Sequence, residues 1–364
     1  TNKNFNKLMG GAPRKPESPL TQKEMDLAAS IQLVTQEVVV KIAKNIRKET
    51  NKKNLCLAGG VALNCVANGI LYKEKIFDEI WIQPAAGDAG GALGAALAYW
   101  YKSTESNNAK NFRRNDTKMK GAYLGPKFNK EQIQESLENC GAVFDIHNYD
   151  DVVELTSNEI INGNAVGWMQ GRMEFGPRAL GNRSIIADPR SKDMQKQLNL
   201  KVKFRESFRP FAPSVLSEYV EEWFDIGINS PYMLLVANVH HQKCLNLDNS
   251  DKNLFGIEKL NIPRSEIPAI THVDFSARVQ TVHSETNKLY HLLINNFFQK
   301  TGCPVLVNTS FNVRGEPIVC SPEDAFKCFM GTDLDILVIE NFILYKKMQD
   351  KSLLENYKDK YELD

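Results

Sequence analysis

Two short apolar segments near the start of the chain are each followed by a glycine-rich turn and then by a helical pattern. Residues 55–60 contain the first segment and turn, and residues 76–91 contain the second. Before them, a capping-box spacing at Thr21 opens an apolar repeat of helical period that extends to about Lys48. Strands that alternate with helices are typical of an α/β layer, because the helices can cover the sheet. The sequence therefore predicts an α/β unit over residues 20–101.

The composition changes after this unit. Residues 103–120 contain Ser, Thr, Asn, Lys and Arg but almost no large apolar side chain, so this stretch cannot anchor itself in a core. Apolar periodicity then resumes, with helical patterns near 130–139 and 152–162 and later runs rich in β-branched residues, such as 336–345. We predict an α+β second domain. The predicted parts are a first domain at 1–102, a linker at 103–120, a second domain at 121–350 and a C-terminal tail at 351–364.

Overall charge and cysteine usage restrict the function. Lys and Arg number 45 and Asp and Glu number 44, so a net charge of +1 gives no long-range attraction to nucleic acid or anionic lipid. No apolar run approaches the roughly 20 residues that span a bilayer. The seven cysteines are scattered and include no Cys-x-x-Cys pair, which favours reduced thiols in a cytoplasmic protein. Because the net charge is close to zero, any anion-binding site must depend on a local group of cations.

Both glycine-rich turns are candidates for ligand binding. Gly59 and Gly60 stand between a predicted strand and a predicted helix start, where backbone N–H groups favour a phosphate or a nucleotide. A tight turn without a ligand is the commoner use of such glycines. Asp88 lies in the second turn, where it can cap the following helix or hold a metal that bridges nucleotide phosphates. The local pattern favours capping.

Basic residues are concentrated between Trp168 and Ser214, where ten of them meet four acidic residues. Many stand among glycines, prolines and aromatic residues rather than along a solvated helix face. Guanidinium groups fixed in this way match phosphate and carboxylate oxygens. RNA is the weaker alternative, because a chain of net charge +1 binds polyanions poorly. The ten cations are Arg172, Arg178, Arg183, Arg190, Lys192, Lys196, Lys201, Lys203, Arg205 and Arg209.

Two later segments add to this set. Arg278 follows Asp274 in a short polar segment, and the polar run 308–312 comes directly after a predicted strand. For that run, exposed turn chemistry and a role in a site remain equally open. The six histidines show no metal-ligand spacing.

Five motifs, taken in order, resemble the O-carbamoyltransferases that modify nodulation factors, cephem and aminoglycoside antibiotics. The motifs are AGGVALN, AGDAGGALGAA, GRMEFGPRALGNRS, KFRESFRPFAPS and NTSFN, and the match covers nearly the whole chain. Members of that family join an actin-like (ASKHA) ATPase domain to a YrdC-like domain. The resemblance implies that the first domain is the C-terminal part of an actin-like domain and that the second is a YrdC-like α+β domain.

The resemblance also implies a reaction. In that family the YrdC-like domain hydrolyses carbamoyl phosphate to carbamate and condenses it with ATP, which yields carbamoyl adenylate and pyrophosphate. The actin-like domain then passes the carbamoyl group to an acceptor hydroxyl. The implied reactants and cofactors are carbamoyl phosphate, ATP with Mg²⁺, a hydroxyl-bearing acceptor and a divalent transition metal such as iron. Hydroxyls of a sugar, an antibiotic scaffold or a nucleoside all remain open as acceptors.

Individual residues match the family's motifs. The resemblance places four cations on the phosphate-bearing reactants, namely Lys203, Arg209, Arg178 and Arg278. It adds further contacts to carbamoyl phosphate or ATP at Arg172, Arg205, Asn308 and Ser310. The adenylate pocket corresponds to Gly59, Gly60 and Asn64, and Asp88 corresponds to the aspartate that ligates the metal. For Asp88 the resemblance thus favours metal binding over capping.

The sequence departs from the family pattern at two places. The histidine pair that completes the metal site has the pattern HxxxH, which this sequence lacks, so we expect it in a preceding segment or in a separate polypeptide. The chain by itself is then expected to lack full transfer activity. The second departure is Phe275, which stands where the family usually has glycine after the aspartate of the arginine motif.

Two other functions compete with this interpretation. A threonylcarbamoyl-adenylate synthase or its transfer partner, acting in tRNA modification with L-threonine and bicarbonate, shares both domain types. The motif GRMEFGPRALGNR favours carbamoyl phosphate instead. A noncatalytic RNA-binding module would follow from the basic cluster alone and would bind RNA with a steep salt dependence.

Overall fold

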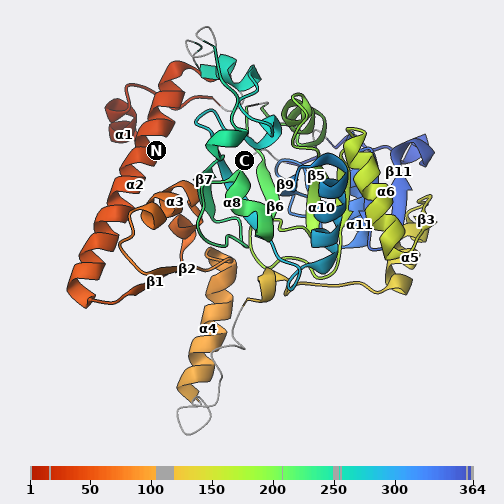
Figure 1. The fold of residues 1–364 in the computed structure, drawn as a ribbon, viewed down its shortest axis with the longest axis horizontal. Helices are drawn as coiled ribbons and strands as arrows, with labels where there is room; N and C mark the ends of the chain where they lie inside the picture. The colour runs from red at the N-terminus through yellow and green to blue at the C-terminus, as the bar shows by residue number, and fades with distance from the viewer. Residues whose placement is uncertain are drawn as a thin grey trace. The chain divides into compact units, whose positions relative to one another are not determined.

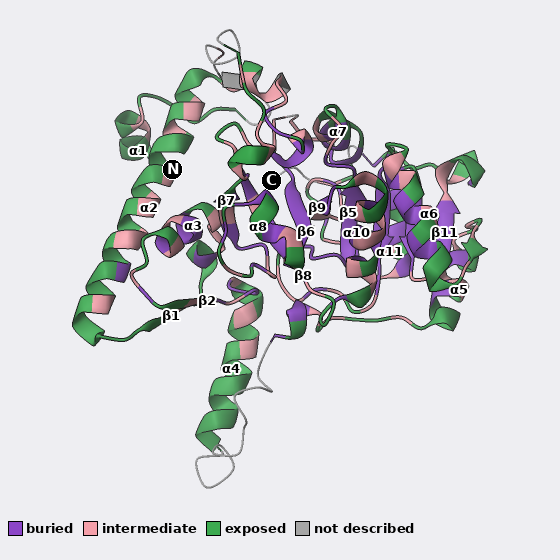
Figure 2. Cartoon of the chain, in the orientation of Figure 1, coloured by how far each residue is buried: buried purple, intermediate pink, exposed green. Residues whose placement is uncertain are grey.

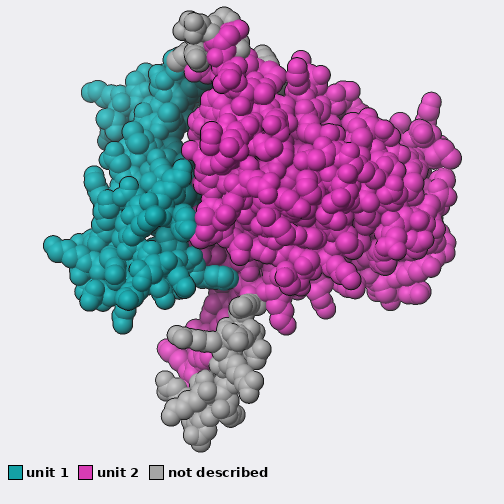
Figure 3. All heavy atoms as spheres, in the orientation of Figure 1, with its two compact units in different colours: residues 1–57, 64–81 teal, residues 58–63, 82–364 magenta. Residues whose placement is uncertain are grey.

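The computed structural model describes residues 2–15, 18–103, 119–206, 208–248, 254, 256–357 and 360–361. The chain forms two compact units: unit 1 comprises Thr1–Leu57 and Asn64–Trp81, and unit 2 comprises Ala58–Leu63 and Ile82–Asp364 (Figure 3). Most of the predicted linker, residues 104–118, lies outside the described residues, as do residues 358–359 and 362–364 of the predicted tail.

Unit 1 is built around one long helix and a two-stranded sheet (Figure 1). Its elements are α1 (Lys3–Leu8), α2 (Gln22–Thr50), β1 (Asn54–Leu57), α3 (Cys65–Lys73) and β2 (Glu79–Ile82). The Thr21 backbone N–H donates to Glu24 Oε2 at 2.9 Å, which completes the predicted capping box at the start of α2. Asn51, with a left-handed φ of 51°, ends the helix. The predicted long helix is therefore confirmed.

Helix α2 leaves much of its apolar stripe exposed. Ala43 packs against Leu71 and Phe77 in a small core. Ile31 and Ile42, which belong to the predicted amphipathic pattern, are 61% and 54% exposed. Contiguous apolar surface of this kind marks an interaction site in soluble proteins. Unit 1 therefore buries one side of α2 and leaves the apolar stripe open.

Unit 2 contains a mixed sheet that has nine strands among the described residues, in the order β3-β11-β10-β4-β5-β9-β6-β8-β7 (Figure 1). The strands β10 and β4 pair in parallel, as do β6 and β8, and the other neighbouring strands of this sheet among the described residues pair antiparallel. The bounds are β3 (Asp145–Ile146), β4 (Val166–Met169), β5 (Arg183–Ala187), β6 (Ala212–Leu216), β7 (Leu235–Asn238), β8 (Ser276–Val282), β9 (Val305–Ser310), β10 (Ile336–Ile339) and β11 (Phe342–Tyr345).

Two helix pairs pack on this sheet. The first is α6 (Tyr149–Ile161) with α10 (Lys288–Thr301), and the second is α5 (Lys130–Asn139) with α11 (Pro322–Met330). The predicted helix at 130–139 is confirmed at both ends. The helix predicted near 152–162 begins earlier, because Asn148 caps it by accepting a hydrogen bond from the Asp151 N–H. Shorter helices are α7 (Met194–Gln197) and α8 (Val220–Trp223). Helix α4 (Asp88–Ser103) begins inside the predicted second glycine turn, so Asp88, Gly90 and Gly91 belong to the helix.

The core of unit 2 lies along the middle of the sheet. Strands β4, β5, β6 and β10 are buried at every position, and Figure 2 shows β5 and β6 in the colour of buried residues. Strands buried on both faces often read as continuous apolar runs; β4 and β10 do so, whereas β5 and β6 include the buried polar residues Arg183, Ser184 and Ser214. The structure confirms a mixed α/β architecture with a large mixed sheet. None of the helices within the described residues combines the length and apolar character that a membrane crossing requires.

Candidate functional site

Lys203 lies in a ring of oxygen atoms at the end of β9. Its Nζ donates to the backbone oxygen and the side-chain oxygen of Asn312, both at 2.8 Å, and to the backbone oxygen and hydroxyl of Ser310. The side chain is buried, at 3% exposure. Burial, followed by the positive charge of Arg205, lowers the pKa of Lys203 to about 7. The structure thus brings together two of the predicted site residues, Lys203 and Ser310.

Lys203 directly follows a π-helical turn over Leu198–Val202, and this turn positions its side chain. The Lys203 N–H donates to the Leu198 carbonyl at 2.9 Å, five residues back, which is the hydrogen bond of a π-turn. Such turns often occur at functional sites because they redirect a side chain without ending the helix.

The loop after β9 is held from the C-terminal residues. Tyr357 and Tyr361 each donate a hydroxyl hydrogen bond to Glu316 Oε1 at 3.1 Å. The other carboxylate oxygen of Glu316 accepts the Val313 N–H at 2.8 Å, and its backbone oxygen accepts from the Asn312 amide at 2.6 Å. Residues of the predicted tail therefore fix the loop that supplies Lys203 with two of its acceptors.

Guanidinium groups gather beside Lys203. Burial and the positive charges of Arg209, Arg278 and Arg314 lower the pKa of Arg205 to about 10, an effect that the Glu206 carboxylate opposes. Cations brought together in excess of their neighbouring carboxylates cost electrostatic energy, and the cost falls when an anion binds among them. The predicted residues Lys203, Arg205, Arg209 and Arg278 therefore form one cationic cluster, which we call the cation cluster.

Protein groups hold several members of the cation cluster in place. Arg205 Nε donates to Asn199 Oδ1 at 2.7 Å, and its guanidinium carbon lies 5.1 Å from the centre of the Phe211 ring. Arg209 donates to Glu206 at 3.1 Å and is partly exposed. Arg278, on β8, has a buried Nε for which the described residues supply no hydrogen-bond partner.

Phe275 adopts the left-handed conformation, with φ of 63°. Its backbone is fixed by hydrogen bonds, since its N–H donates to the His272 carbonyl at 3.0 Å and its carbonyl accepts the Val239 N–H at 2.8 Å. Glycine adopts this conformation at the lowest cost, which is a physical reason for the glycine that the resembled family has there. The turn before Arg278 therefore has the left-handed backbone conformation that glycine favours, although the residue there is Phe275.

Asn308 belongs to the core and not to the ring around Lys203. It is 1% exposed, and its amide nitrogen donates to Ser214 Oγ and Gln280 Oε1, both at 2.9 Å, and to the Ala179 carbonyl at 3.2 Å. These contacts tie β9 to β6 and β8. The amide nitrogen of Asn308 is thus already used by the protein.

The motif at residues 171–184 forms the connection between β4 and β5, and Glu174 organises it. One oxygen of this buried carboxylate accepts N–H groups from Leu180, Asn182 and Arg183, at 2.7, 2.8 and 3.3 Å. Burial raises the pKa of Glu174, although the N–H groups of Asn182 and Leu180 and the positive charge of Arg183 oppose that rise. A single acid therefore shapes the loop from inside.

Arg183 is the residue that the sequence reasoning undervalued. It was one of ten cations in a cluster, yet its side chain is wholly buried. Its guanidinium donates only to backbone carbonyls, and these belong to Pro126, Gln170, Gly171, Asn182 and Cys320. Arg183 is therefore a structural cation that binds five backbone carbonyls and joins its own strand to the segments at 126, 170–171 and 320, and no feature of the local sequence separates it from its neighbours.

The other two arginines of this motif lie in different surroundings. Arg178 Nη2 donates to the Leu63 carbonyl at 3.2 Å, within unit 2. Arg172 is exposed and donates to the Gly125 carbonyl at 3.1 Å, at the rim of a cavity that the four cations of the cluster do not line. The structure thus separates Arg172 from the cation cluster.

The predicted adenylate-binding residues belong to different units. Gly59 and Gly60 are part of unit 2, where a Cβ on either would meet nothing within 4 Å, and Gly59 has a φ of 99°. Asn64 is part of unit 1, caps α3 by accepting the Ala67 N–H, and exchanges amide hydrogen bonds with Gln32 at 3.0 and 3.2 Å. The space beside the glycines is open, whereas the Asn64 side chain is engaged.

Asp88 stands in the first turn of α4 and is exposed. Within the part of the chain that the structure describes, no three His, Cys, Asp or Glu side chains gather as a metal-ligand set. The donors present around Asp88 therefore do not by themselves fit a transition-metal site, which needs about three or four protein ligands.

Comparison with known proteins places the chain in a family. Residues 1–97 match the family model "Carbamoyltransferase N-terminus" and residues 157–346 match "Carbamoyltransferase C-terminus". An uncharacterized protein of Synechocystis sp. is 56% identical over 100% of this chain and 59% of its own length. Nodulation protein NolO of Bradyrhizobium diazoefficiens is 42% identical over 94% of this chain and 59% of its own length. Nodulation protein NolNO of Sinorhizobium fredii is 41% identical over 92% of this chain and 46% of its own length.

A solved structure of full-length HypF in a phosphate- and nucleotide-bound form covers 56% of this chain and 23% of its own, at 17% identity. Its TM-score of 0.34 is too low to identify the fold. The chain spans about half to three-fifths of the length of the curated relatives it matches. The two family models together cover both units, and the chain belongs to the carbamoyltransferase family of enzymes.

Proposed function

We propose that this chain carries the carbamoyl-adenylate-forming part of an ATP-dependent O-carbamoyltransferase. The observation that supports it most is the cation cluster, in which a buried lysine with a pKa lowered to about 7 lies beside Arg205, Arg209 and Arg278. A concentration of fixed positive charge suits reactants that carry several phosphates, and it would stabilise the charge that develops during phosphoryl or adenylyl transfer.

The proposed chemistry has three balanced steps. Water and carbamoyl phosphate give carbamate and phosphate. A carbamate oxygen then attacks the α-phosphorus of ATP, which forms carbamoyl adenylate and expels pyrophosphate. An acceptor hydroxyl finally attacks the carbamoyl carbon and releases AMP. Mg²⁺ bound with ATP would offset part of the triphosphate charge, while Lys203, Arg209 and Arg278 would hold the anionic oxygens in place.

The architecture that we propose follows the family resemblance. Residues 121–350 would be the YrdC-like domain that makes the adenylate, and residues 1–102 would be the C-terminal part of an actin-like domain that receives it at Gly59 and Gly60. The open space beside both glycines supports a ligand that approaches the backbone closely. The exposed apolar stripe of α2 supports a further segment of the actin-like domain, in cis or in trans, that covers it.

Pyrophosphate release tests the proposal directly. Given carbamoyl phosphate, ATP and Mg²⁺ without an acceptor, the chain is expected to release phosphate and pyrophosphate. Arg209→Ala should slow this release by about tenfold to a hundredfold and leave the fold intact, since loss of one charge-assisted contact weakens binding by roughly 1.5–3 kcal/mol. The exposed cation Lys196 supplies the control, and Lys196→Ala should retain activity.

Parallel reactions separate the competing functions. Pyrophosphate release with L-threonine and bicarbonate, but not with carbamoyl phosphate, would identify a threonylcarbamoyl-adenylate synthase. Salt-sensitive RNA binding without ATP consumption would identify an RNA-binding module. A folded sample that consumes neither substrate pair would refute the adenylate-forming assignment.

Metal content provides a second test. The chain alone is expected to hold a divalent transition ion weakly or not at all, because Asp88 is a single exposed carboxylate and firm binding takes about three or four ligands. Carbamoyl transfer to a hydroxyl should then be absent, and it should appear when the N-terminal part of a full-length relative is added. Elemental analysis after dialysis measures the metal, with Asp88→Asn as the matched variant. One tightly held ion per chain would show that the ligand set is already complete.

A further inference from the structure

The last described residues of the chain are fixed to unit 2 at two places. Gln349 makes the first contact, because its amide nitrogen donates to the Val143 carbonyl at 2.8 Å and its amide oxygen accepts the Val143 N–H at 3.0 Å. Tyr357 makes the second contact, since its side chain is 3% exposed and lies against Gly331 at the end of α11. We call residues 349–357 and 360–361 the C-terminal segment.

The Tyr357 ring fits closely because residue 331 is glycine. A Cβ added to Gly331 would overlap the ring, so any larger residue there would displace it. The Tyr361 ring meets the Tyr357 ring edge-on at 5.6 Å, and Lys360 Nζ lies 4.4 Å from the centre of the Tyr357 ring. These contacts hold the Tyr357 hydroxyl in one orientation, which points it at Glu316.

Glu316 links the C-terminal segment to the acceptors of Lys203. Its Oε1 accepts hydrogen bonds from the hydroxyls of Tyr357 and Tyr361, both at 3.1 Å. Its backbone oxygen accepts the Asn312 side-chain amide at 2.6 Å. The amide oxygen of Asn312 in turn accepts Lys203 Nζ at 2.8 Å. A path of hydrogen bonds therefore connects the two tyrosines with the buried ammonium.

The charge of Glu316 also acts on Lys203. Burial and Arg205 lower the pKa of Lys203 to about 7, whereas Cys328 and Glu316 act in the opposite direction. Cys328 is itself buried, and burial raises the pKa of its thiol well above the usual value, so the thiol is neutral at neutral pH. Of these neighbours, Glu316 is thus the acid that favours the charged form of Lys203.

We propose that Glu316 is a positioning residue for the Lys203 ammonium, and that Tyr357 and Tyr361 hold Glu316 in that position. Loss of the two hydroxyl hydrogen bonds would loosen residues 311–316, which include one of the residues that accept from Lys203. The C-terminal segment then contributes to anion binding through this loop. The positioning follows from the geometry of the loop, and its effect on catalysis rests on the proposed function.

A variant that combines Tyr357→Phe with Tyr361→Phe tests the hydrogen-bonded path and keeps both rings. Loss of the hydroxyl hydrogen bonds should favour opening of the loop, so that the amides of residues 311–316 exchange with deuterium about fivefold faster or more. Hydrogen-exchange mass spectrometry measures this on the 364-residue chain without substrates. Exchange at the wild-type rate would overturn the role of the tyrosines.

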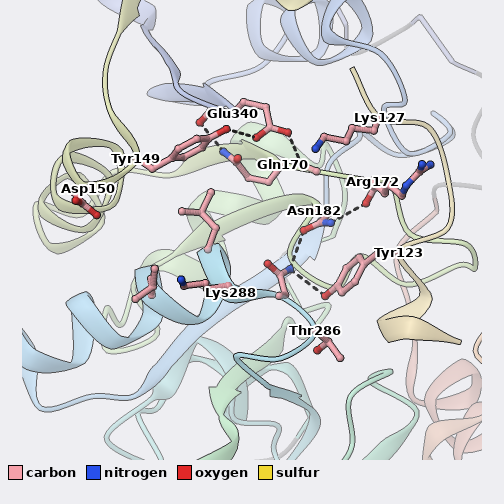
Figure 4. Close-up of a pocket in the computed structure, with 14 residues that line it drawn as sticks. Tyr123, Lys127, Tyr149, Asp150, Gln170, Arg172, Asn182, Thr286, Lys288 and Glu340 are labelled. Atoms are coloured by element: carbon pink, nitrogen blue, oxygen red, sulfur yellow. Dashed lines mark hydrogen bonds between the residues drawn. The ribbon is translucent and has the colours of Figure 1, made fainter. Parts of the chain in front are cut away.

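Tyr149→Phe provides the matched control. The Tyr149 hydroxyl donates to Glu340 Oε2 at 3.0 Å, and both residues line a cavity of about 660 Å³ in unit 2 (Figure 4). Lys203, Asn312 and Glu316 do not line this cavity. The control removes the same kind of hydrogen bond, so exchange at residues 311–316 should stay unchanged. Equal acceleration in the control would mean a general loss of stability and would contradict the proposal.

Glu316→Gln tests the charge, because it nearly preserves the shape of the side chain. Lys203 should titrate near pH 7 in the wild-type chain and at a lower pH in this variant, since the acid that favours the ammonium is gone. NMR of protein with lysine isotopically labelled at Cε follows the titration, and Lys203→Arg identifies the signal. A merely structural role would not move it. An unchanged titration would show that Glu316 does not act on Lys203.

Steady-state kinetics connect the loop to the reaction. The double tyrosine variant should raise the KM for carbamoyl phosphate by about fivefold and change kcat less, because the Lys203 ammonium is held less firmly. Failure of the wild-type chain to release pyrophosphate would refute the proposed function alone, since exchange and titration need no substrate. A wild-type KM in the double variant would overturn the effect on catalysis.

Discussion

Replacing Lys203 by alanine is expected to reduce pyrophosphate release from carbamoyl phosphate and ATP by about a hundredfold or more, while the sheet remains folded. The Lys203 ammonium is the buried member of the cation cluster and lies against Ser310 and Asn312. Its removal takes away one positive charge. The neighbouring arginines cannot replace that charge, because their own contacts hold them in place. Circular dichroism checks the fold, and initial rates check the effect. A variant with near-normal rates would remove Lys203 from the reaction.

The contribution of Lys203 to anion binding should depend on pH. Because burial and Arg205 lower the pKa of Lys203 to about 7, the free protein loses the ammonium charge as the pH rises through about 7. Affinity for carbamoyl phosphate should therefore fall above that pH. Lys203→Arg keeps its charge and should bind with a flatter pH profile, even if its rate is low. Identical profiles for the two proteins would show that the Lys203 charge does not contact the anion.

Arg183→Met is expected to lower the free energy of unfolding by about 3–5 kcal/mol, the largest stability effect that we anticipate. The guanidinium is wholly buried and donates to five backbone carbonyls, so methionine would leave those oxygens without this donor. It would also leave Glu174 buried without the positive charge that opposes its rise in pKa. Urea denaturation measures the change.

Lys196→Met provides the matched control, because it removes an exposed cation from the same basic stretch. Its effect should stay within about 0.5 kcal/mol. A change of less than about 1 kcal/mol for Arg183→Met would mean that water or a rearranged loop satisfies the carbonyls, and that Arg183 is not a structural centre.

The local elements could be predicted because their causes are local. The capping box at Thr21 and the helix at Lys130–Asn139 depend on contacts between residues three or four apart, so the sequence contains all the information that they need. The run 336–345 was predictable as extended chain but not as a hairpin. Its loop places Glu340 at a left-handed position, where turn preferences would put glycine or asparagine.

The cation cluster was predictable only in outline. The motifs and the family resemblance selected Lys203, Arg205, Arg209 and Arg278, and the structure gathers these four. The motifs and the resemblance could not show that Arg172 lies at another cavity or that Asn308 belongs to the core. Both facts depend on which strands pair, and strand pairing joins residues more than a hundred positions apart.

The sequence by itself therefore determined the main helices, the extended segments and the family, because these follow from local periodicity, capping and the residues of the motifs. Only the tertiary structure decided which cations of this stretch are buried and what surrounds each of them. Arg183 and Lys203 stand in the same basic stretch and are both buried. The Arg183 guanidinium donates to backbone carbonyls, whereas the Lys203 ammonium donates to oxygens of Ser310 and Asn312 at the end of β9 and lies beside Arg205. Burial and neighbouring charge set the energy of a charged group, and both are fixed by contacts that are distant in sequence.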